Sequence, residues 1–247
     1  MRRIIRVPLG SSDQGELDRR QARADRQVQE CSFQPQREWK RARKTVLLRA
    51  ILAVLKSMTG GRERCMYCLD SHGTDIDHFW PKTPYPGKMF RWPNLLLCCT
   101  ECGRLKGDRF PLSGGQPLLI DPTFEEPWLH LDFDPETGNV VARFDTQRND
   151  WSPKGLKTVE ILQLDRREAL SAGCTRTFNR LSSLIARALI EGVPRVSELI
   201  PSLQEADDHG LLGWCLLGTG QNISPFSDFR KEHPEAWSAC VAVAQKS

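Results

Sequence analysis

Apolar residues recur at helical spacing in two long stretches of the chain. The first lies in residues 36–58 and predicts one amphipathic helix that ends before Gly60-Gly61; its stripe is Trp39, Ala42, Val46, Ile51, Val54, Leu55 and Met58. The second follows a capping-box pattern, Asp165 and Glu168, and ends at Gly192-Val193-Pro194. Its stripe is Leu170, Cys174, Phe178, Leu181, Ile185 and Ala188. Shorter helices are expected near 196–205, 208–217 and 226–244, with Pro201 interrupting or bending the first.

Alternation of apolar and polar residues predicts a β-hairpin within 117–145. Leu129, Leu131 and Phe133 alternate with polar neighbours, as do Val140, Ala142 and Phe144 in the next segment. The turn-rich sequence DPETGN separates the two. Residues 16–30 are helix-prone but nearly without apolar side chains, so their ordering calls for a partner surface or a nucleic acid.

Residues 62–111 differ from the rest because they combine closely spaced cysteines with many prolines and glycines. This composition is typical of a small metal-stabilised module with a thin core. We therefore expect an α+β chain, mainly helical, in four regions. These are a basic helical N-terminal region (1–61), the metal-stabilised module (62–115), a β-hairpin connection (116–150) and a helical C-terminal region (151–247).

Composition narrows the class of protein. The 247 residues are 39% hydrophobic, which excludes a disordered chain, and no apolar run reaches the ~18 residues of a membrane span. The basic start, MRRIIRVPLG, lacks the apolar core of a secretory signal, so we expect a cytoplasmic, reducing setting. The net charge of +4 divides into +9 for residues 1–64, +1 for 65–115 and −6 for 116–247. The basic first quarter is consistent with binding to a polyanion and equally with a solvent-exposed helix face. The acidic residues 116–247 are expected by default to form solvated helix faces, with docking of a partner as the alternative.

Two cysteine pairs predict a zinc site. Cys65-x-x-Cys68 is followed by thirty residues and then by Cys99-x-x-Cys102. Such pairs place four thiolates around one tetrahedral Zn²⁺, and a closed four-sulfur site is structural because no position remains for water. Cys98 competes with Cys99, but the two-residue spacing is the tighter one. Buried thiols without a metal are the alternative. The other five cysteines are expected to be ordinary thiols.

Further residues between and after the two cysteine pairs carry a family resemblance. They are Asp77, His78, Pro81, Asn94, Leu95 and Lys106. Together with the cysteines they resemble the HNH endonucleases, also called ββα-metal or His-Me finger nucleases. The resemblance implies two short strands with His78 near the end of the first, then a loop, and a helix that starts near Cys102.

The same resemblance implies the chemistry. His78 is expected to act as the general base on water, Asp77 to ligate one catalytic Mg²⁺ or Mn²⁺, and Asn94 to hydrogen-bond the loop backbone and orient the histidine. The family usually has Asn or His directly after the last cysteine as a second metal ligand, but this chain has Gly103. Three nearby acids are candidates to complete the metal shell: Asp75, Glu101 and Asp108.

Basic side chains around this motif suggest contacts with nucleic acid. The candidates are Lys82, Arg104 and Lys106, although Lys106 suits an internal strut equally well. Aromatic residues nearby, Trp80, Tyr85, Phe90 and Trp92, could stack on unpaired bases, but packing is the favoured role. DNA is the favoured substrate, and RNA remains possible because the chemistry does not require DNA.

A weaker resemblance extends over the whole chain. The order of MRRIIR, the cysteine-rich module, PLLID, TGNV, the helix after Asp165 and SPFSDFR near the end looks like the nuclease subunits of Septu-type anti-phage systems, including those attached to retrons. It implies a bacterial defence complex with an ABC/SMC-like ATPase partner. The competing interpretation is a non-catalytic zinc module that binds nucleic acid or protein. Gly103 supports that alternative, and the Asp77-His78 pair argues against it.

Overall fold

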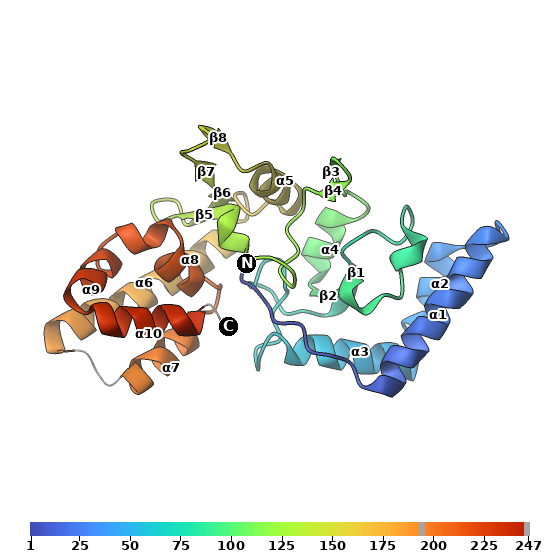
Figure 1. Ribbon diagram of the computed structural model, residues 1–247, viewed down its shortest axis with the longest axis horizontal. Coiled ribbons are helices and arrows are strands. Elements are labelled where there is room, and N and C mark those ends of the chain that lie inside the picture. Colours follow the sequence, from blue (N-terminus) through green and yellow to red (C-terminus); the bar gives the residue numbers. More distant parts are fainter. Residues whose placement is uncertain (193–195, 245–247) are drawn as a thin grey trace.

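The computed structural model describes residues 1–192 and 196–244. Figure 1 shows an elongated molecule with the N-terminal helices at one end, the C-terminal helices at the other, and short hairpins between them. The described residues form a mainly helical α+β fold, as the sequence predicts, and one connected apolar core runs through both ends.

The N-terminal region contains three helices: α1 (Ser11–Gln29), α2 (Pro35–Ala42) and α3 (Val46–Ser57). The single helix predicted over residues 36–58 is therefore wrong. Thr45 breaks it, because its hydroxyl donates to the carbonyl of Ala42 at 2.7 Å and caps α3 by accepting from the Leu48 amide at 3.5 Å. This capping competes with helix continuation. As a result Trp39 lies on α2, separated from the apolar stripe of α3.

The cysteine-rich module has a strand, a second strand and then a helix. Strand β1 (Asp75–His78) pairs antiparallel with β2 (Leu95–Cys98), with His78 opposite Leu95, and helix α4 (Thr100–Lys106) follows. The loop 79–94 between the strands contains two short 3-10 helices, Pro86–Lys88 and Trp92–Asn94. The helix begins slightly before the predicted Cys102, because Cys99 caps it.

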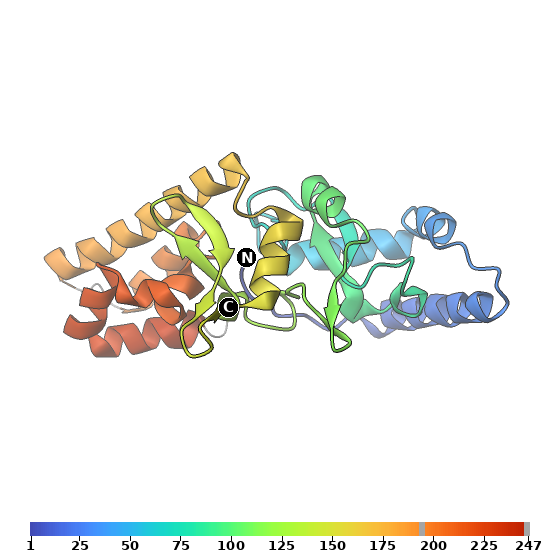
Figure 2. The same cartoon turned by 90° about the horizontal axis from the view of Figure 1, so that it is seen from above.

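The connecting region is built from short hairpins. In order these are β3 (Leu112–Ser113) with β4 (Gln116–Pro117), β5 (Leu131–Asp134) with β6 (Asn139–Ala142), and β7 (Phe144–Asp145) with β8 (Asp150–Trp151). A 3-10 helix, Pro127–Leu129, precedes β5. The predicted hairpin is confirmed by the β5–β6 pair, in which buried residues alternate with half-exposed ones. Leu129 and Phe144, which also belong to the predicted alternation, lie outside this pair and are exposed. Helix α5 (Pro153–Leu162) packs on β6 and on α4, joining this region to the module (Figure 2).

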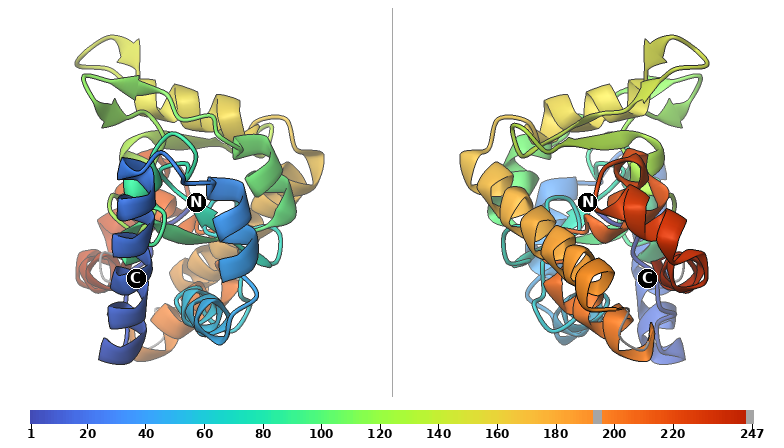
Figure 3. Two further views of the ribbon diagram at one scale, coloured as in Figure 1. Left: turned by 90° about the vertical axis from the view of Figure 1, so that its right-hand side faces the viewer. Right: turned by 90° about the vertical axis from the view of Figure 1, so that its left-hand side faces the viewer.

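The C-terminal region is helical. It comprises α6 (Glu168–Glu191), α7 (Val196–Ala206), α8 (Leu212–Leu217), a 3-10 helix (Thr219–Asn222), α9 (Phe226–Glu232) and α10 (Pro234–Ala244). Figure 3 shows α6 running along the outside of this region. The predicted cap at Asp165 is wrong, since Arg167 is the N-cap of α6 and makes no side-chain cap bond. Helix α7 continues through Pro201, and a new helix starts at Pro234 within the predicted 226–244 segment. Part of the predicted helix end at Gly192-Val193-Pro194 lies outside the described residues.

Within residues 1–192 and 196–244, no helix is both long and apolar enough to cross a bilayer.

Candidate active site and cysteine cluster

Four cysteines converge in the module, and they are the four that the sequence predicts. Cys65, Cys68, Cys99 and Cys102 are buried, and their sulfur atoms all lie within 4.8 Å of one another. The Sγ atoms of Cys68 and Cys99 are 3.9 Å apart. Zn–S bonds of ~2.3 Å in a tetrahedron place sulfurs ~3.8 Å apart, so the spacing and the donor chemistry fit Zn²⁺.

Arg167 lies against this cluster, a contact that no local sequence signal predicts. Its Nη1 donates to Cys102 Sγ at 3.3 Å, and its Nη2 pairs with the carboxylate of Glu101. Burial disfavours the charged guanidinium, but the thiolates of Cys102 and Cys68 outweigh burial and raise the pKa of Arg167. A tetrathiolate zinc site carries net negative charge, so a buried cation beside one sulfur is the counter-charge that such a site needs. The carboxylate of Glu101, one of the candidates to complete the catalytic-metal shell, is therefore engaged in an ion pair with Arg167.

His78 ends β1, and one hydrogen bond orients its ring. Its Nε2 lies 3.0 Å from the carbonyl oxygen of Met89. A carbonyl can only accept, so Nε2 carries the proton and Nδ1 keeps its lone pair. No other hydrogen bond to this ring occurs within the described residues. Burial, followed by the nearby charges of Lys82 and Lys106, lowers the pKa of His78 to about 3, so the ring is neutral near pH 7.

Helix α2 covers His78. The ring of Trp39 meets the imidazole edge-on, with centroids 4.3 Å apart, and His78 is 4% exposed. Arg43, the C-cap of the same helix, pairs through its guanidinium with Asp75 Oδ2 at 3.0 Å. The histidine is therefore largely enclosed, with the Trp39 ring against the imidazole.

Asn94 ties the two ends of the loop 79–94 together. Its Oδ1 accepts from the Trp80 amide at 2.7 Å, while its Nδ2 donates to the carbonyls of Trp80 at 3.0 Å and Lys88 at 2.9 Å. Lys88 directly precedes Met89, whose carbonyl holds His78. The bonds of Asn94 thus fix the backbone on which the histidine's orientation depends.

Asp77 and Lys106 form a buried ion pair next to His78. Lys106 is 0% exposed, and its Nζ lies 2.9 Å from Asp77 Oδ2 and donates to the His78 carbonyl at 2.6 Å. The same Asp77 oxygen accepts from the hydroxyl of Tyr67 at 2.7 Å. Of the two roles left open by the sequence, this geometry corresponds to a strut. Tyr67 is a site residue that the sequence analysis missed, because nothing in the segment of the first cysteine pair indicates that its hydroxyl contacts Asp77.

Ligands for a divalent ion are sparse. The four cysteines are the one group of three or more potential metal ligands that converge within the described part of the chain. The second oxygen of Asp77, Oδ1, makes no hydrogen bond to any residue that the structure describes, and Mg²⁺ is often held by one or two carboxylates plus substrate phosphates and waters. That donor set fits one ion that binds together with substrate. At Gly103 an added Cβ would lie 3.5 Å from Cys98 Sγ, an ordinary contact, so a side chain has room to start there.

The remaining candidates lie at the surface. Arg104 is exposed on α4, and Lys82 is half-buried in the loop. Neither has an ion pair or a side-chain hydrogen bond with any described residue. Asp108 is exposed just after α4, and Asp75 shares one face of β1 with Asp77 because the two are two residues apart on a strand.

Comparison with known proteins relates the chain to Septu proteins. No family model matches the chain. It is 29% identical to the Septu protein PtuB of Bacillus thuringiensis, over 55% of this chain and 47% of that protein. It is 30% identical to the Septu protein PtuB of Bacillus mycoides (strain KBAB4), over 47% of this chain and 46% of that protein. The chain is homologous to Septu protein PtuB.

The match to PtuB is partial. The chain spans about half the length of these relatives. It also matches the Septu protein PtuA of Bacillus mycoides (strain KBAB4) at 34% identity, over 30% of this chain and 11% of that protein. The resemblance to Septu-type proteins predicted from the sequence is thereby confirmed as homology to Septu protein PtuB over about half of the chain.

Proposed function

We propose that the chain is a metal-dependent HNH endonuclease that hydrolyses phosphodiester bonds, with DNA as the favoured substrate, within a bacterial anti-phage defence complex. The observation that carries the proposal is the state of His78. A carbonyl fixes the proton on Nε2, and Nδ1 is left as a neutral base at the end of β1. Homology to PtuB and the order of β1, β2 and α4 around the cysteine cluster support it further.

The residues divide the work as follows. Nδ1 of His78 accepts the proton of the attacking water, and the Met89 carbonyl keeps the ring in the required tautomer. Asn94 holds the loop that carries this carbonyl, and Lys106 joins α4 to β1. Asp77 would hold the divalent ion through Oδ1. When bound, that ion supplies positive charge for the phosphate and the leaving oxygen.

Catalysis requires the enclosed histidine to open. The Trp39 ring occupies the space beside the imidazole and His78 is 4% exposed, so we expect α2 to move before a substrate phosphate reaches Nδ1. Helix α2 has 8 residues and buries only Trp39 and Ala42, so a limited apolar contact holds it in place. An ABC/SMC-like ATPase partner, which the wider resemblance implies, is the component that we expect to control this opening.

The second candidate function is a zinc-stabilised binding module without catalysis. Two observations favour it: Gly103 provides no metal ligand, and His78 is enclosed. A cleavage assay separates the two candidates. Supercoiled plasmid and structured RNA are incubated with Mg²⁺ or Mn²⁺ and the protein, alone and with its ATPase partner. The nuclease proposal expects nicked or linear products that disappear with His78→Ala. Intact substrates under every condition would favour the binding module.

A further inference from the structure

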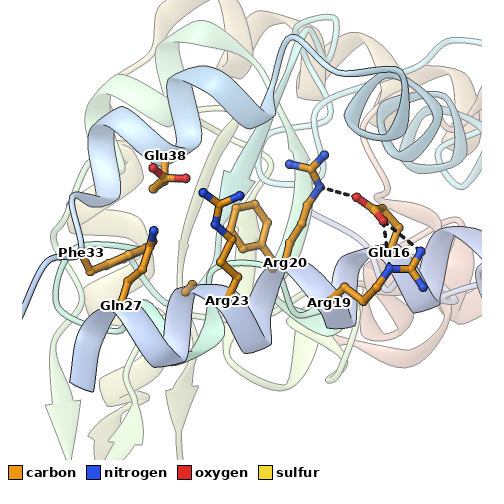
Figure 4. A pocket seen from close by; sticks show the side chains of 9 residues that line it. Glu16, Arg19, Arg20, Arg23, Gln27, Phe33 and Glu38 are labelled. Atoms are coloured by element: carbon orange, nitrogen blue, oxygen red, sulfur yellow. Dashed lines mark hydrogen bonds and ion pairs between the residues drawn. The ribbon is translucent and has the colours of Figure 1, made fainter. Parts of the chain in front are cut away.

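A polar cavity lies between α1 and α2, beside the candidate active site. It has a volume of about 300 Å³, and three arginines of α1 border it: Arg19, Arg20 and Arg23. Figure 4 shows Arg20 and Arg23 extending from α1 toward α2, with Glu38 across the opening. Phe33 and Phe90 supply apolar walls. Cationic and aromatic side chains around one opening suit a nucleotide better than a purely apolar ligand.

A buried glutamine fixes α1 next to the active-site loop. Gln21 is 0% exposed, its Oε1 accepts from the Phe90 amide at 2.7 Å, and its Nε2 donates to the Pro86 carbonyl at 3.0 Å. Both partners belong to the loop that holds His78. Because Gln21 sets the register, the arginines on either side of it on α1 have defined positions relative to that loop. Gln21, Leu17 and Ala24 are the buried residues of α1, and this face attaches the polar helix predicted over residues 16–30 to the rest of the chain.

The charges around the cavity are not balanced. Glu16 pairs with Arg19 at 2.9 Å and with Arg20 at 3.2 Å, and Glu38 pairs with Arg41 at 3.3 Å. Arg23 has neither an ion pair nor a hydrogen bond with any residue that the structure describes. A guanidinium without a partner at a cavity attracts an anion, and a phosphate matches its planar donors.

We propose that this cavity binds a backbone phosphate of the nucleic-acid strand, next to the phosphate that is cleaved. The connection to the active site is short: the Phe90 ring at the cavity lies 6.2 Å from that of Trp39, which lies 4.3 Å from that of His78. A nucleic-acid strand bound by Arg23 and Arg20 therefore passes Trp39, which covers the proposed general base, His78. The proposal rests on the proposed function for the identity of the ligand, and its test separates binding from cleavage.

The test compares two arginines on one helix. Arg23→Ala and Arg26→Ala remove the same charge, and both side chains are exposed, but only Arg23 borders the cavity. Binding of a fluorescein-labelled 20-nucleotide DNA is measured by anisotropy without added divalent ion, between 50 and 200 mM NaCl. We expect Arg23→Ala to weaken binding roughly tenfold and to reduce the salt slope by about 0.7 for a single strand, and Arg26→Ala to change affinity less than about twofold.

Each result decides one of the two claims. Equal effects of the two variants, or no effect of Arg23→Ala, would overturn the phosphate site in favour of general charge attraction. His78→Ala should bind DNA like the wild type. If the wild type binds through Arg23 but never cleaves, the phosphate site stands and the nuclease proposal fails. If the wild type cleaves and Arg23→Ala binds and cleaves equally well, the nuclease proposal stands and the phosphate site fails.

Discussion

Replacing Lys106 by methionine tests the buried ion pair that joins α4 to β1. Methionine keeps the unbranched stem and removes the ammonium, so Asp77 loses its 2.9 Å partner and the His78 carbonyl loses its 2.6 Å donor. Breaking a buried pair by removing one partner costs roughly 3–5 kcal/mol. Asp77 keeps the Tyr67 hydroxyl, and its side chain is 16% exposed, so we expect the lower end, about 3 kcal/mol. For a chain of this length, 1 kcal/mol shifts Tm by about 2–4 °C, which predicts a fall of about 6–12 °C.

Thermal unfolding followed by circular dichroism measures this loss, with zinc content checked before each scan. The double variant Lys106→Met/Asp77→Asn removes the unpaired carboxylate as well and should regain part of the lost stability. A Tm within about 2 °C of the wild type for Lys106→Met would refute the reasoning. So would a double variant less stable than the single one, because the cost then would not come from the unpaired charge.

Four further predictions concern protonation, metal and access. Burial lowers the pKa of His78 to about 3 and that of His209, a buried histidine shortly before α8, to about 4. As the pH falls below about 6.5, each of these histidines therefore takes up its proton in the unfolded chain before it does so in the folded chain. The free energy of unfolding, measured by urea titration, should decrease by about 1.4 kcal/mol per pH unit for each histidine as the pH falls. His78→Gln should remove the contribution of His78. Gly103→Asn, which places a ligand where space exists, should increase the Mg²⁺-dependent single-turnover cleavage rate; an unchanged rate would count against a metal at this position. Arg167→Leu should accelerate zinc release to a chromogenic chelator, whereas Arg166→Leu, at an exposed arginine one residue earlier, should not. Diethylpyrocarbonate should leave His78 unmodified in the wild type and modify it in Trp39→Ala; labelling of wild-type His78 would contradict the enclosure.

Local patterns predicted the parts of this molecule that depend on neighbouring residues. The spacing of Cys65, Cys68, Cys99 and Cys102 sufficed for the cluster, because two knuckles of fixed geometry leave few other arrangements. The alternation around Phe133 sufficed for the β5–β6 hairpin, because burial on one face of a hairpin imposes a period of two.

Contacts between distant segments could not be obtained in this way. The break before Thr45 separates Trp39 from the stripe of α3 and directs it to His78, whereas a periodicity count joins them. The contact of Arg167 with the cysteine cluster was not predicted, because the sequence at Asp165 resembles a capping box that the chain does not use. The two errors have different physical causes. Thr45 breaks the first helix through a local cap. Arg167 instead finds its partners, Cys102 and Glu101, in a distant segment, where tertiary contacts override local preference.

Chemical rescue of a histidine deletion tests the central claim most directly. The variant His78→Gly removes the imidazole and leaves a space that free imidazole can enter. Single-turnover cleavage of a labelled DNA is measured with Mg²⁺ and the ATPase partner for the wild type, for His78→Gly and for His72→Gly, a matched change at an exposed histidine of the same module. We predict that His78→Gly alone is inactive, that added imidazole restores part of its rate, and that His72→Gly cleaves like the wild type. Cleavage by His78→Gly at the wild-type rate would contradict it.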